Sequence, residues 1–456
     1  METSRLRLCR HDRIPLEAAL LGLVVLLGTI LRCVQLTRAL NAPLDPDTIG
    51  YLTIAKRILS GNLDFTEPGQ GGLFTREPLY PLVLAFALWI AGPASEHVVV
   101  RATSVVTSVL AIPVTYLLAR RLFGSYVAPL ASLLVALNGI LVILSSRGLR
   151  EDLVGLFLLA LLIAAYGVDR APNSRKRPFG HLCAAALLSL LLVVTRYEMV
   201  LVTIAVGVLL LLYPSTRGLK NRLSSSIAIT CSSLLGVGMD MAIAYAAKVD
   251  PAGGSKALAS WLYWFEFSSD HSTTYLQQGI WISMRDYLGH HSVAQLVFLE
   301  IRGFKFLLEQ MNWVFVPYPL WNGTVFVDLY RFMNQYLYSS YPVLAALPIM
   351  AYVAVLGFVH TLQDGKVRLL VLPIVIPTCA YCFLYGVINV GDLIRYVAQF
   401  FPIIFITTSA FLVGLGKTVR YPSRLNCSGD RFKICLYYCL CMIMTTIIIT
   451  MILLYV

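Results

Sequence analysis

Residues 14–31 read IPLEAALLGLVVLLGTIL, an apolar run with a single charged residue, Glu17. A helix of this length spans about 27 Å, close to the hydrocarbon thickness of a bilayer. Several arginines precede the run, as in a signal peptide, but no small-residue cleavage site follows it. We therefore expect a retained first membrane span near residues 14–37.

Apolar runs of this kind recur along the chain. Hydrophobic residues make up 58% of it and charged residues 13%, whereas soluble domains have about 45–50% and about 25%. Only helices satisfy their own backbone hydrogen bonds in lipid, and these runs are too long for barrel strands. The sequence predicts an all-α, polytopic integral membrane protein with about eleven spans. They lie near 14–37, 98–119, 125–146, 152–168, 179–195, 199–213, 224–247, 343–362, 369–390, 397–416 and 434–456.

Basic residues orient these spans. With the N-terminus in the cytoplasm, the short basic connections all fall on the cytoplasmic side, where lysine and arginine accumulate. The apolar segment 79–92 is short, and counting it as a span would place those connections outside, so we expect an interfacial or re-entrant helix there. The net charge of +12 then reflects these loops and anionic lipid, and it does not imply nucleic acid.

Two large loops, 38–97 and 248–342, then lie on the non-cytoplasmic side. We divide the chain into an N-terminal core over 1–247 that includes the first loop, an outer loop over 248–342, and C-terminal spans over 343–456. The second loop holds five of the six tryptophans. Such rings lie at the headgroup level or stack on sugar faces, and we favour the first role.

Charged and aromatic residues gather at four places on the predicted outer face. A carboxylate beside a span can act as a general base on a hydroxyl or amine, although Asp47 could equally cap a helix that starts at Thr48. Arginines suit a lipid phosphate because guanidinium binds phosphate oxygens bidentately, but charges at span ends are often only solvated. The candidates are Asp45, Asp47, Tyr51, Arg76, Glu77 and Tyr80 in the first loop, and Arg150, Glu151, Arg196, Arg395 and Tyr396 in later turns.

Metal binding has two candidate places. Glu151 and Asp152 form an acidic pair that could hold a cation. His290 and His291 are adjacent, so they point to different sides, and no carboxylate stands at ligand spacing from them. We therefore expect no metal at the histidines.

Four stretches resemble the GT-C superfamily of glycosyltransferases that use polyprenyl-phosphate sugars, above all the protein mannosyltransferases and the lipid A aminoarabinose transferase. They are Asp45-Pro-Asp47 through Tyr51 to Ala55 with Gly61, Arg76 to Pro81, Leu118 to Gly124 continuing to Arg150-Glu151, and Arg395-Tyr396 followed by Pro402. The first three lie within residues 40–155 in the family's order and spacing. The resemblance implies juxtamembrane helices in the outer loops and an acceptor-side aspartate at Asp47. Thr48 stands where a glutamate is common.

The resemblance implies an enzyme that moves a sugar from a polyprenyl-phosphate donor to a protein, lipid or glycan acceptor with inversion. Asp47 would be the base, and the phosphate would lie near Arg395 and near Arg150 or Arg76. We expect a prokaryotic plasma membrane protein with its active site outside. A divalent cation, Mg²⁺ or Mn²⁺, is the one cofactor that the resemblance leaves open.

Two other classes of protein stay open. A transporter or flippase of a lipid-linked sugar usually has ionisable residues near the middle of the bilayer. Here most charge lies in the outer loops, and Asp240 in the seventh span is an exception. A non-catalytic membrane subunit that presents its aromatic loop to a partner is the second alternative.

Overall fold

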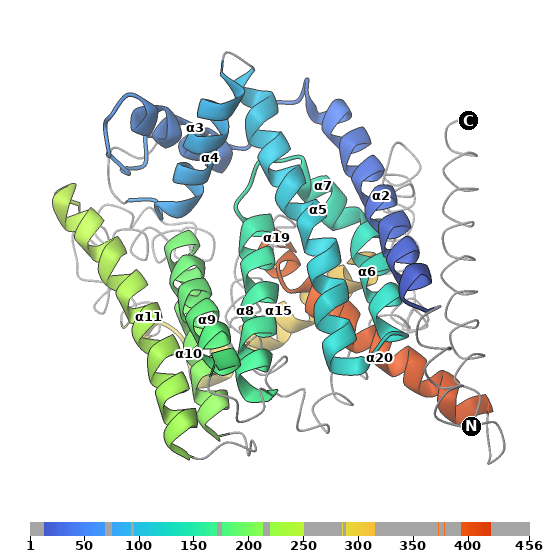
Figure 1. The fold of residues 1–456 in the computed structure, drawn as a ribbon. Helices are drawn as coiled ribbons and strands as arrows, with labels where there is room; N and C mark the ends of the chain where they lie inside the picture. Colours follow the sequence, from blue (N-terminus) through green and yellow to red (C-terminus); the bar gives the residue numbers. More distant parts are fainter. Residues whose placement is uncertain are drawn as a thin grey trace.

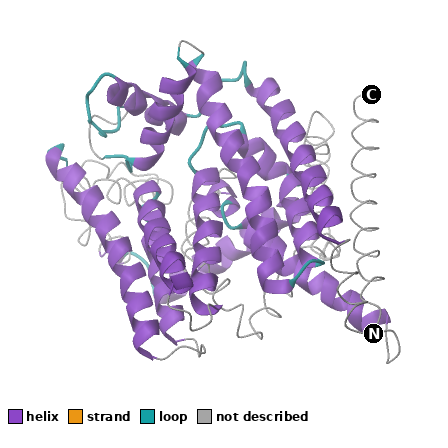
Figure 2. Cartoon of the chain, viewed as in Figure 1, coloured by secondary structure: helices purple, strands orange, loops and turns teal. Residues whose placement is uncertain are grey.

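The structure, a computed structural model, describes residues 13–68, 75–92, 95–170, 176–212, 219–249, 285, 289–314, 373, 378 and 394–420. These residues are almost entirely helical (Figure 2), and the one β-bridge among them joins Thr66 to Thr75. The helices are α2 (Arg13–Ala39), α3 (Pro46–Leu59), α4 (Leu79–Ala91), α5 (Glu96–Phe123), α6 (Val127–Leu137), α7 (Gly139–Ser145), α8 (Glu151–Arg170), α9 (Lys176–Thr195), α10 (Met199–Leu212), α11 (Leu219–Ala246), α15 (Val293–Val314), α19 (Ile394–Ala398) and α20 (Phe401–Arg420).

The long helices form a bundle, and α3 and α4 lie together at one end of it (Figure 1). We call this the cap end; it comprises α3, α4 and the turns at 146–150 and 196–198. Four helical stretches in the described ranges are long and apolar enough to cross a membrane: Leu16–Ala39, Glu96–Phe123, Glu151–Val168 and Leu219–Ala246. They agree with the predicted class, an all-α membrane protein.

The number of spans stays a prediction. Helices α9, α10 and α20 are apolar but their apolar parts are shorter than the four above. The predicted spans near 343–362, 369–390 and 434–456 lie outside the described residues, apart from residues 373 and 378. Segment 79–92 forms α4, which is too short to cross a bilayer by itself and packs against α3.

The predicted span over 125–146 is not one continuous helix, because the chain breaks between α6 and α7. Asn138 has an extended backbone, and its side chain accepts a hydrogen bond from the amide of Leu141 at 2.8 Å, so it caps α7. The break frees carbonyls at the end of α6. The buried guanidinium of Arg32 donates to those of Val135 and Ala136 at 3.2 and 3.1 Å. A buried arginine in the first span thus stabilises a broken helix.

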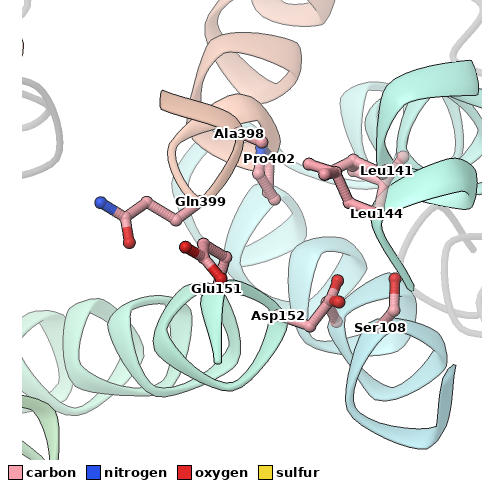
Figure 3. Close-up of a pocket in the computed structure, with 10 residues that line it drawn as sticks. Ser108, Leu141, Leu144, Glu151, Asp152, Ala398, Gln399 and Pro402 are labelled. Carbon is pink, nitrogen blue, oxygen red and sulfur yellow. The ribbon is translucent and has the colours of Figure 1, made fainter. Parts of the chain in front are cut away.

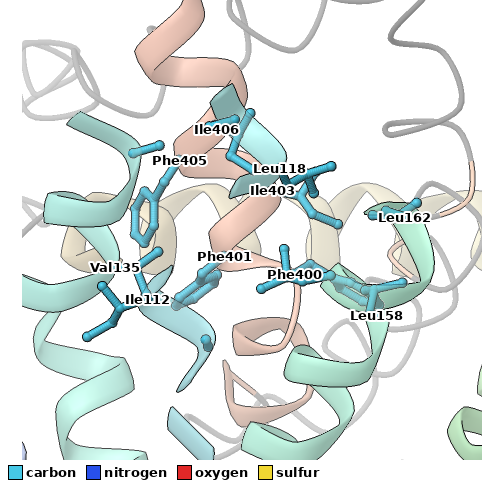
Figure 4. Close-up of a cluster of buried hydrophobic side chains, with 14 of the residues drawn as sticks. Ile112, Leu118, Val135, Leu158, Leu162, Phe400, Phe401, Ile403, Phe405 and Ile406 are labelled. Carbon is cyan, nitrogen blue, oxygen red and sulfur yellow. The ribbon is translucent and has the colours of Figure 1, made fainter. Parts of the chain in front are cut away.

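Two hydrophobic clusters fix the helices that carry the candidate site. In the main core (Figure 4), Phe401 and Phe405 of α20 pack among residues of α5 and α6 such as Ile112 and Val135. A second cluster joins α3 and α4 to the start of α5 through a large apolar set: Tyr51, Leu52, Ala55, Tyr80, Leu84, Leu88, Val99 and Val100. These contacts bring the first outer loop and the start of α20 to the same region of the molecule.

Candidate active site

Asp45, and not Asp47, caps helix α3. The side chain of Asp45 accepts a hydrogen bond from the amide of Asp47 at 3.1 Å, and Pro46 is the first residue of the helix. Proline suits that first position because it lacks an N–H group and its φ is already helical, so the cap falls on the residue before it. The prediction of a capping role for Asp47 is therefore wrong. Its carboxylate is available for other partners.

The carboxylate of Asp47 lies between two guanidinium groups. Its Oδ1 is 2.9 Å from Nη2 of Arg76, and its Oδ2 is 2.6 Å from Nη2 of Arg395. Burial by itself would raise the pKa of Asp47, but the positive charges of Arg76 and Arg395 outweigh it and hold the pKa at about 2. Asp47 is therefore ionised at neutral pH.

A hairpin places Arg76 beside helix α3. The bridge between Thr66 and Thr75 pairs its two arms, and the amide of Arg76 donates to the carbonyl of Phe65 at 2.9 Å. The Nε–H of Arg76 donates to Glu67, whose carboxylate is buried. The Arg76 guanidinium also lies 4.9 Å from the ring centroid of Tyr51. Four groups, the carboxylates of Asp47 and Glu67 and the ring and hydroxyl of Tyr51, thus hold one arginine.

The turn at 146–150 packs against the first outer loop, residues 38–97. Thr48 Oγ1 donates to the carbonyl of Arg147 at 2.9 Å, and the hydroxyl of buried Tyr80 donates to that of Gly148 at 2.7 Å. Arg101, which is also buried, donates to the carbonyls of Ser146 and Ala42 at 2.9 and 2.7 Å. Sequence reasoning left open whether these two segments meet, and the structure brings them together.

Arg150 and Glu77 form an ion pair that joins a third segment to this cluster. Arg150 also donates to the carbonyl of Thr195 at 3.3 Å, and the other oxygen of Glu77 accepts from the amide of Tyr197 at 3.3 Å. Burial would lower the pKa of the Arg150 guanidinium, but Glu77 and the other nearby acidic groups together outweigh this and raise the pKa. Arg150 stays charged, and its charge is already matched by Glu77.

Arg196, in the turn that follows α9, also belongs to this cluster of charged residues. It is fully buried and lies 3.7 Å from Glu151 Oε1 and 3.4 Å from Glu198 Oε2. Its guanidinium is 4.6 Å from the ring centroid of Tyr396, and that of Arg395 is 4.8 Å from the same ring. The four predicted places therefore meet in one layer at the cap end.

A small pocket lies beneath this layer, between α5, α7, α8 and the start of α20. Ser108, Glu151, Asp152 and Gln399 are among its lining residues (Figure 3). Its volume of about 20 Å³ suffices for a water molecule. Oδ2 of Asp152 accepts from Ser104 Oγ at 2.9 Å. At that volume the pocket is too small for a sugar.

The acidic pair at the start of α8 does not make a complete metal site in the described ranges. Glu151 pairs with Arg196, and Asp152 accepts from Ser104. No group of three or more histidines, cysteines, aspartates or glutamates with a suitable arrangement occurs among the residues that the structure describes. Mg²⁺ and Mn²⁺ prefer several oxygen ligands, and this pair offers too few of them. A divalent cation therefore stays an expectation, and no step of the proposed reaction depends on it.

Sequence reasoning missed several residues that hold the site together. They are Arg32, Glu67, Arg101, Glu198 and Gln399. Arg32 and Arg101 carried a signal, because a charge within an apolar span is costly unless it is paired. Glu67 and Gln399 carried none, since an acid or amide in a loop is ordinary until its neighbours are known.

Gly148 offers a direct test of how the two outer segments dock. Its φ is +74°, and an added Cβ would lie 2.6 Å from Val100 Cγ1 and 3.0 Å from Thr48 Cγ2. We expect Gly148→Ala to destabilise the protein by about 1–3 kcal/mol, from left-handed strain and steric overlap. Thermal unfolding in detergent measures this. Gly124→Ala is the matched control, because its φ is +91° but the space around it is open; equal losses in the two variants would contradict the overlap.

Part of this chain matches a known protein family. Residues 75–237 match the family model of the dolichyl-phosphate-mannose-protein mannosyltransferases. That range contains Arg76, Arg150 and Arg196 but ends before Arg395. No curated protein matches the chain.

Solved structures resemble this chain at low sequence identity, and the oligosaccharyltransferase shares its fold. The apo oligosaccharyltransferase of Archaeoglobus fulgidus is 14% identical, with a TM-score of 0.52 over 95% of this chain and 55% of that one. Its complex with Zn and sulfate is 16% identical, with a TM-score of 0.52 over 95% and 52%. ArnT from Cupriavidus metallidurans, bound to undecaprenyl phosphate, is 13% identical with a TM-score of 0.39 over 87% and 79%.

The chain spans about half the length of the oligosaccharyltransferase that it matches. At these identities the likeness to that enzyme concerns the fold alone. The match to the mannosyltransferase family model is independent of it and covers the turns at 150 and 196. The family match over residues 75–237 and the shared fold agree with the resemblance to GT-C glycosyltransferases that the four motifs indicated.

Proposed function

We propose that this protein transfers a sugar from a polyprenyl-phosphate donor to an acceptor, with Asp47 as the base that takes the acceptor's proton. The observation that carries the proposal is the placement of Asp47 between Arg76 and Arg395, which come from distant parts of the chain. The matching family model supports the donor class, because its description names dolichyl-phosphate mannose.

Arg395 and Arg76 suit the phosphate of such a donor. Guanidinium binds phosphate oxygens through paired N–H donors. The Nε–H of Arg395 has no hydrogen-bond partner among the described residues. A phosphate that accepts from this group and from Arg76 would replace Asp47 as their partner. Arg76 and Arg395 would then balance the negative charge that develops on the phosphate as its bond to the sugar breaks.

The chemistry is a single displacement. The acceptor's hydroxyl or amine attacks the anomeric carbon from the side opposite the phosphate, and the bond between that carbon and the phosphate oxygen breaks. The acceptor's proton passes to Asp47, and the electron pair leaves with the phosphate. The configuration at the anomeric carbon is therefore inverted.

Donor binding would also strengthen Asp47 as a base. With both arginines on its carboxylate, the pKa of about 2 makes Asp47 a weak proton acceptor. A phosphate that draws Arg76 and Arg395 away removes the charges that lower this pKa, so the pKa rises once the donor is bound. The base would thus become effective only when there is a sugar to transfer.

The proposed location follows from charge distribution. The cap end lies opposite Arg120 and Arg121, which belong to the connections that the positive-inside rule assigns to the cytoplasm. We place the site on the non-cytoplasmic face, in the plasma membrane if the source is a prokaryote. The acceptor, whether a protein, a lipid or a glycan, would then approach from outside.

Transfer by the purified protein tests the function. The assay supplies radiolabelled polyprenyl-phosphate mannose or glucose to the protein in nanodiscs, with peptide, lipid and glycan acceptors. Label in an acceptor, with inverted configuration, supports the proposal. Donor binding without transfer to any acceptor class would favour a transporter or a non-catalytic subunit.

Acid should weaken the cap end in a way that depends on Asp47. The pKa of Asp47 is lowered from 3.8 to about 2, so its ion pairs contribute stability above about pH 4 that is lost as the pH falls through 2. The shift corresponds to roughly 2 kcal/mol. We expect the difference in unfolding temperature between wild type and Asp47→Asn to close over this interval. A difference that is constant with pH would contradict the assignment.

A further inference from the structure

Asp240 lies on the face of α11 that packs against the rest of the bundle. The buried residues of this helix recur every three or four positions: Ser226, Ile229, Ser233, Gly236 and Ala244. Asp240 lies between Gly236 and Ala244 and continues this spacing, one turn after Gly236. An added Cβ at Gly236 would lie 3.0 Å from Val193 of α9, so this face is in contact with α9.

That register brings Asp240 beneath the outer turn after α9. Both helices run toward the cap end (Figure 1), and Val193 stands just before the turn that holds Tyr197. The amide of Tyr197 donates to Glu77 at 3.3 Å, and Glu77 pairs with Arg150. Glu77 and Arg150 are also the charged groups that act electrostatically on Asp240. Asp240 therefore faces the Glu77–Arg150 ion pair from the membrane side.

No residue in the described ranges donates a hydrogen bond to the carboxylate of Asp240. Both of its oxygens are removed from solvent, and neither has a partner in the part of the chain that the structure describes. The nearby guanidinium of Arg150 is already held by Glu77 and by the carbonyl of Thr195. A buried carboxylate without a donor is costly, and in membrane spans such groups mark substrate sites.

We propose that Asp240 binds the sugar of the donor, with its two oxygens accepting hydrogen bonds from hydroxyl groups of the ring. The inference rests on the proposed function, since it assigns a contact for that same donor. A metal ion is a poorer occupant, because it needs several oxygen ligands and Glu77, the acid that acts electrostatically on Asp240, is paired with Arg150.

Tyr51 connects this position with the proposed phosphate site. Its ring centroid is 4.9 Å from the guanidinium carbon of Arg76 and 5.8 Å from that of Arg150. Arg76 and Arg150 therefore lie against one aromatic ring, and Arg150 is one of the two charged groups that act electrostatically on Asp240. The proposal requires the sugar to extend from a phosphate at Arg76 past Tyr51 toward Asp240.

Equilibrium binding in nanodiscs, with the full-length chain, separates sugar from phosphate recognition. The ligands are polyprenyl phosphate, polyprenyl-phosphate mannose and polyprenyl-phosphate glucose. We expect wild type to bind at least one sugar-bearing lipid more tightly than the bare phosphate. Asp240→Ala should lower affinity for that lipid about tenfold or more, because its hydrogen bonds to the ring hydroxyls are lost. Its affinity for bare polyprenyl phosphate should not change.

Two further variants make the result interpretable. Asp240→Asn keeps one acceptor oxygen and should show an intermediate loss. Met241→Ala changes the next residue, which is 49% exposed on the outer face of α11, and should behave as wild type.

Three results would overturn the proposal. Equal losses for all three lipids in Asp240→Ala would make its role purely structural. A wild type that gains nothing from either sugar would remove the sugar contact but leave the phosphate site. A wild type that binds no polyprenyl phosphate would remove the proposed function as well.

Discussion

Asp47→Asn is expected to lower the rate of sugar transfer by about a hundredfold or more while leaving the protein folded. A general base contributes about 10²–10⁴ to a rate, and asparagine is nearly the same size but accepts no proton. The measurement is the single-turnover rate with donor at saturation, so that binding does not enter. The unfolding temperature reports on the fold in the same preparation.

Donor affinity should move in the opposite direction. In the wild type a phosphate must displace the Asp47 carboxylate from Arg76 and Arg395, whereas asparagine carries no charge to displace. We therefore expect Asp47→Asn to bind polyprenyl phosphate as tightly as wild type or more tightly. A slower reaction together with retained binding separates the loss of a base from damage to the site.

Asp64→Asn is the matched control for this change. Asp64 lies in the same outer loop and pairs with Arg57 at 3.0 Å, and its side chain also accepts from the amide of Thr66. Asparagine keeps that turn contact, so the variant should transfer sugar at the wild-type rate. If Asp47→Asn were as active as Asp64→Asn, Asp47 would not be the base.

Arg395→Ala should weaken binding of both bare and sugar-bearing polyprenyl phosphate by about a hundredfold. Charge-assisted hydrogen bonds are roughly twice as strong as neutral ones, and a buried bidentate contact would be lost. Binding is measured with the same lipids in nanodiscs. Arg395→Lys keeps the charge but not the planar fork, so it should recover only part of the affinity.

The pattern across ligands distinguishes Arg395 from Asp240. Loss of Arg395 should affect every phosphate-bearing lipid alike, whereas loss of Asp240 should affect only those with a sugar. Arg57→Ala is the matched control, because Arg57 occupies the same outer layer but contacts Asp64 and Thr66 instead. Unchanged binding in Arg395→Ala with lost transfer would mean that Arg395 acts only on Asp47.

Local features of the sequence were sufficient to predict the class of fold. Apolar runs and basic loops depend on neighbouring residues and on the bilayer, so the helices at 14–37, 98–119 and 152–168 could be read directly. Breaks inside a run could not. Asn138 interrupts an apolar segment only because a cap for α7 and the guanidinium of Arg32 together satisfy the backbone groups that the break exposes.

The residues of the candidate site were also visible in the sequence, but their pairing was not. Asp47 and Arg395 are separated by 348 positions and meet at 2.6 Å. That contact depends on the packing of α20 against α5 and α6, and on the cluster that holds α3 and α4 against α5. Sequence motifs alone could not say which arginine neutralises which carboxylate.

The sequence by itself therefore determined a helical membrane protein, the orientation expected from its basic loops, and a set of charged residues on one predicted face. Only the tertiary structure decided that Asp45 is the cap and Asp47 the carboxylate between two arginines. It also decided that Asp240 interacts electrostatically with Glu77 and Arg150 while no described residue donates a hydrogen bond to it. Helix formation and membrane insertion follow from local hydrophobicity, whereas the partners of a buried charge depend on which distant helices pack around it.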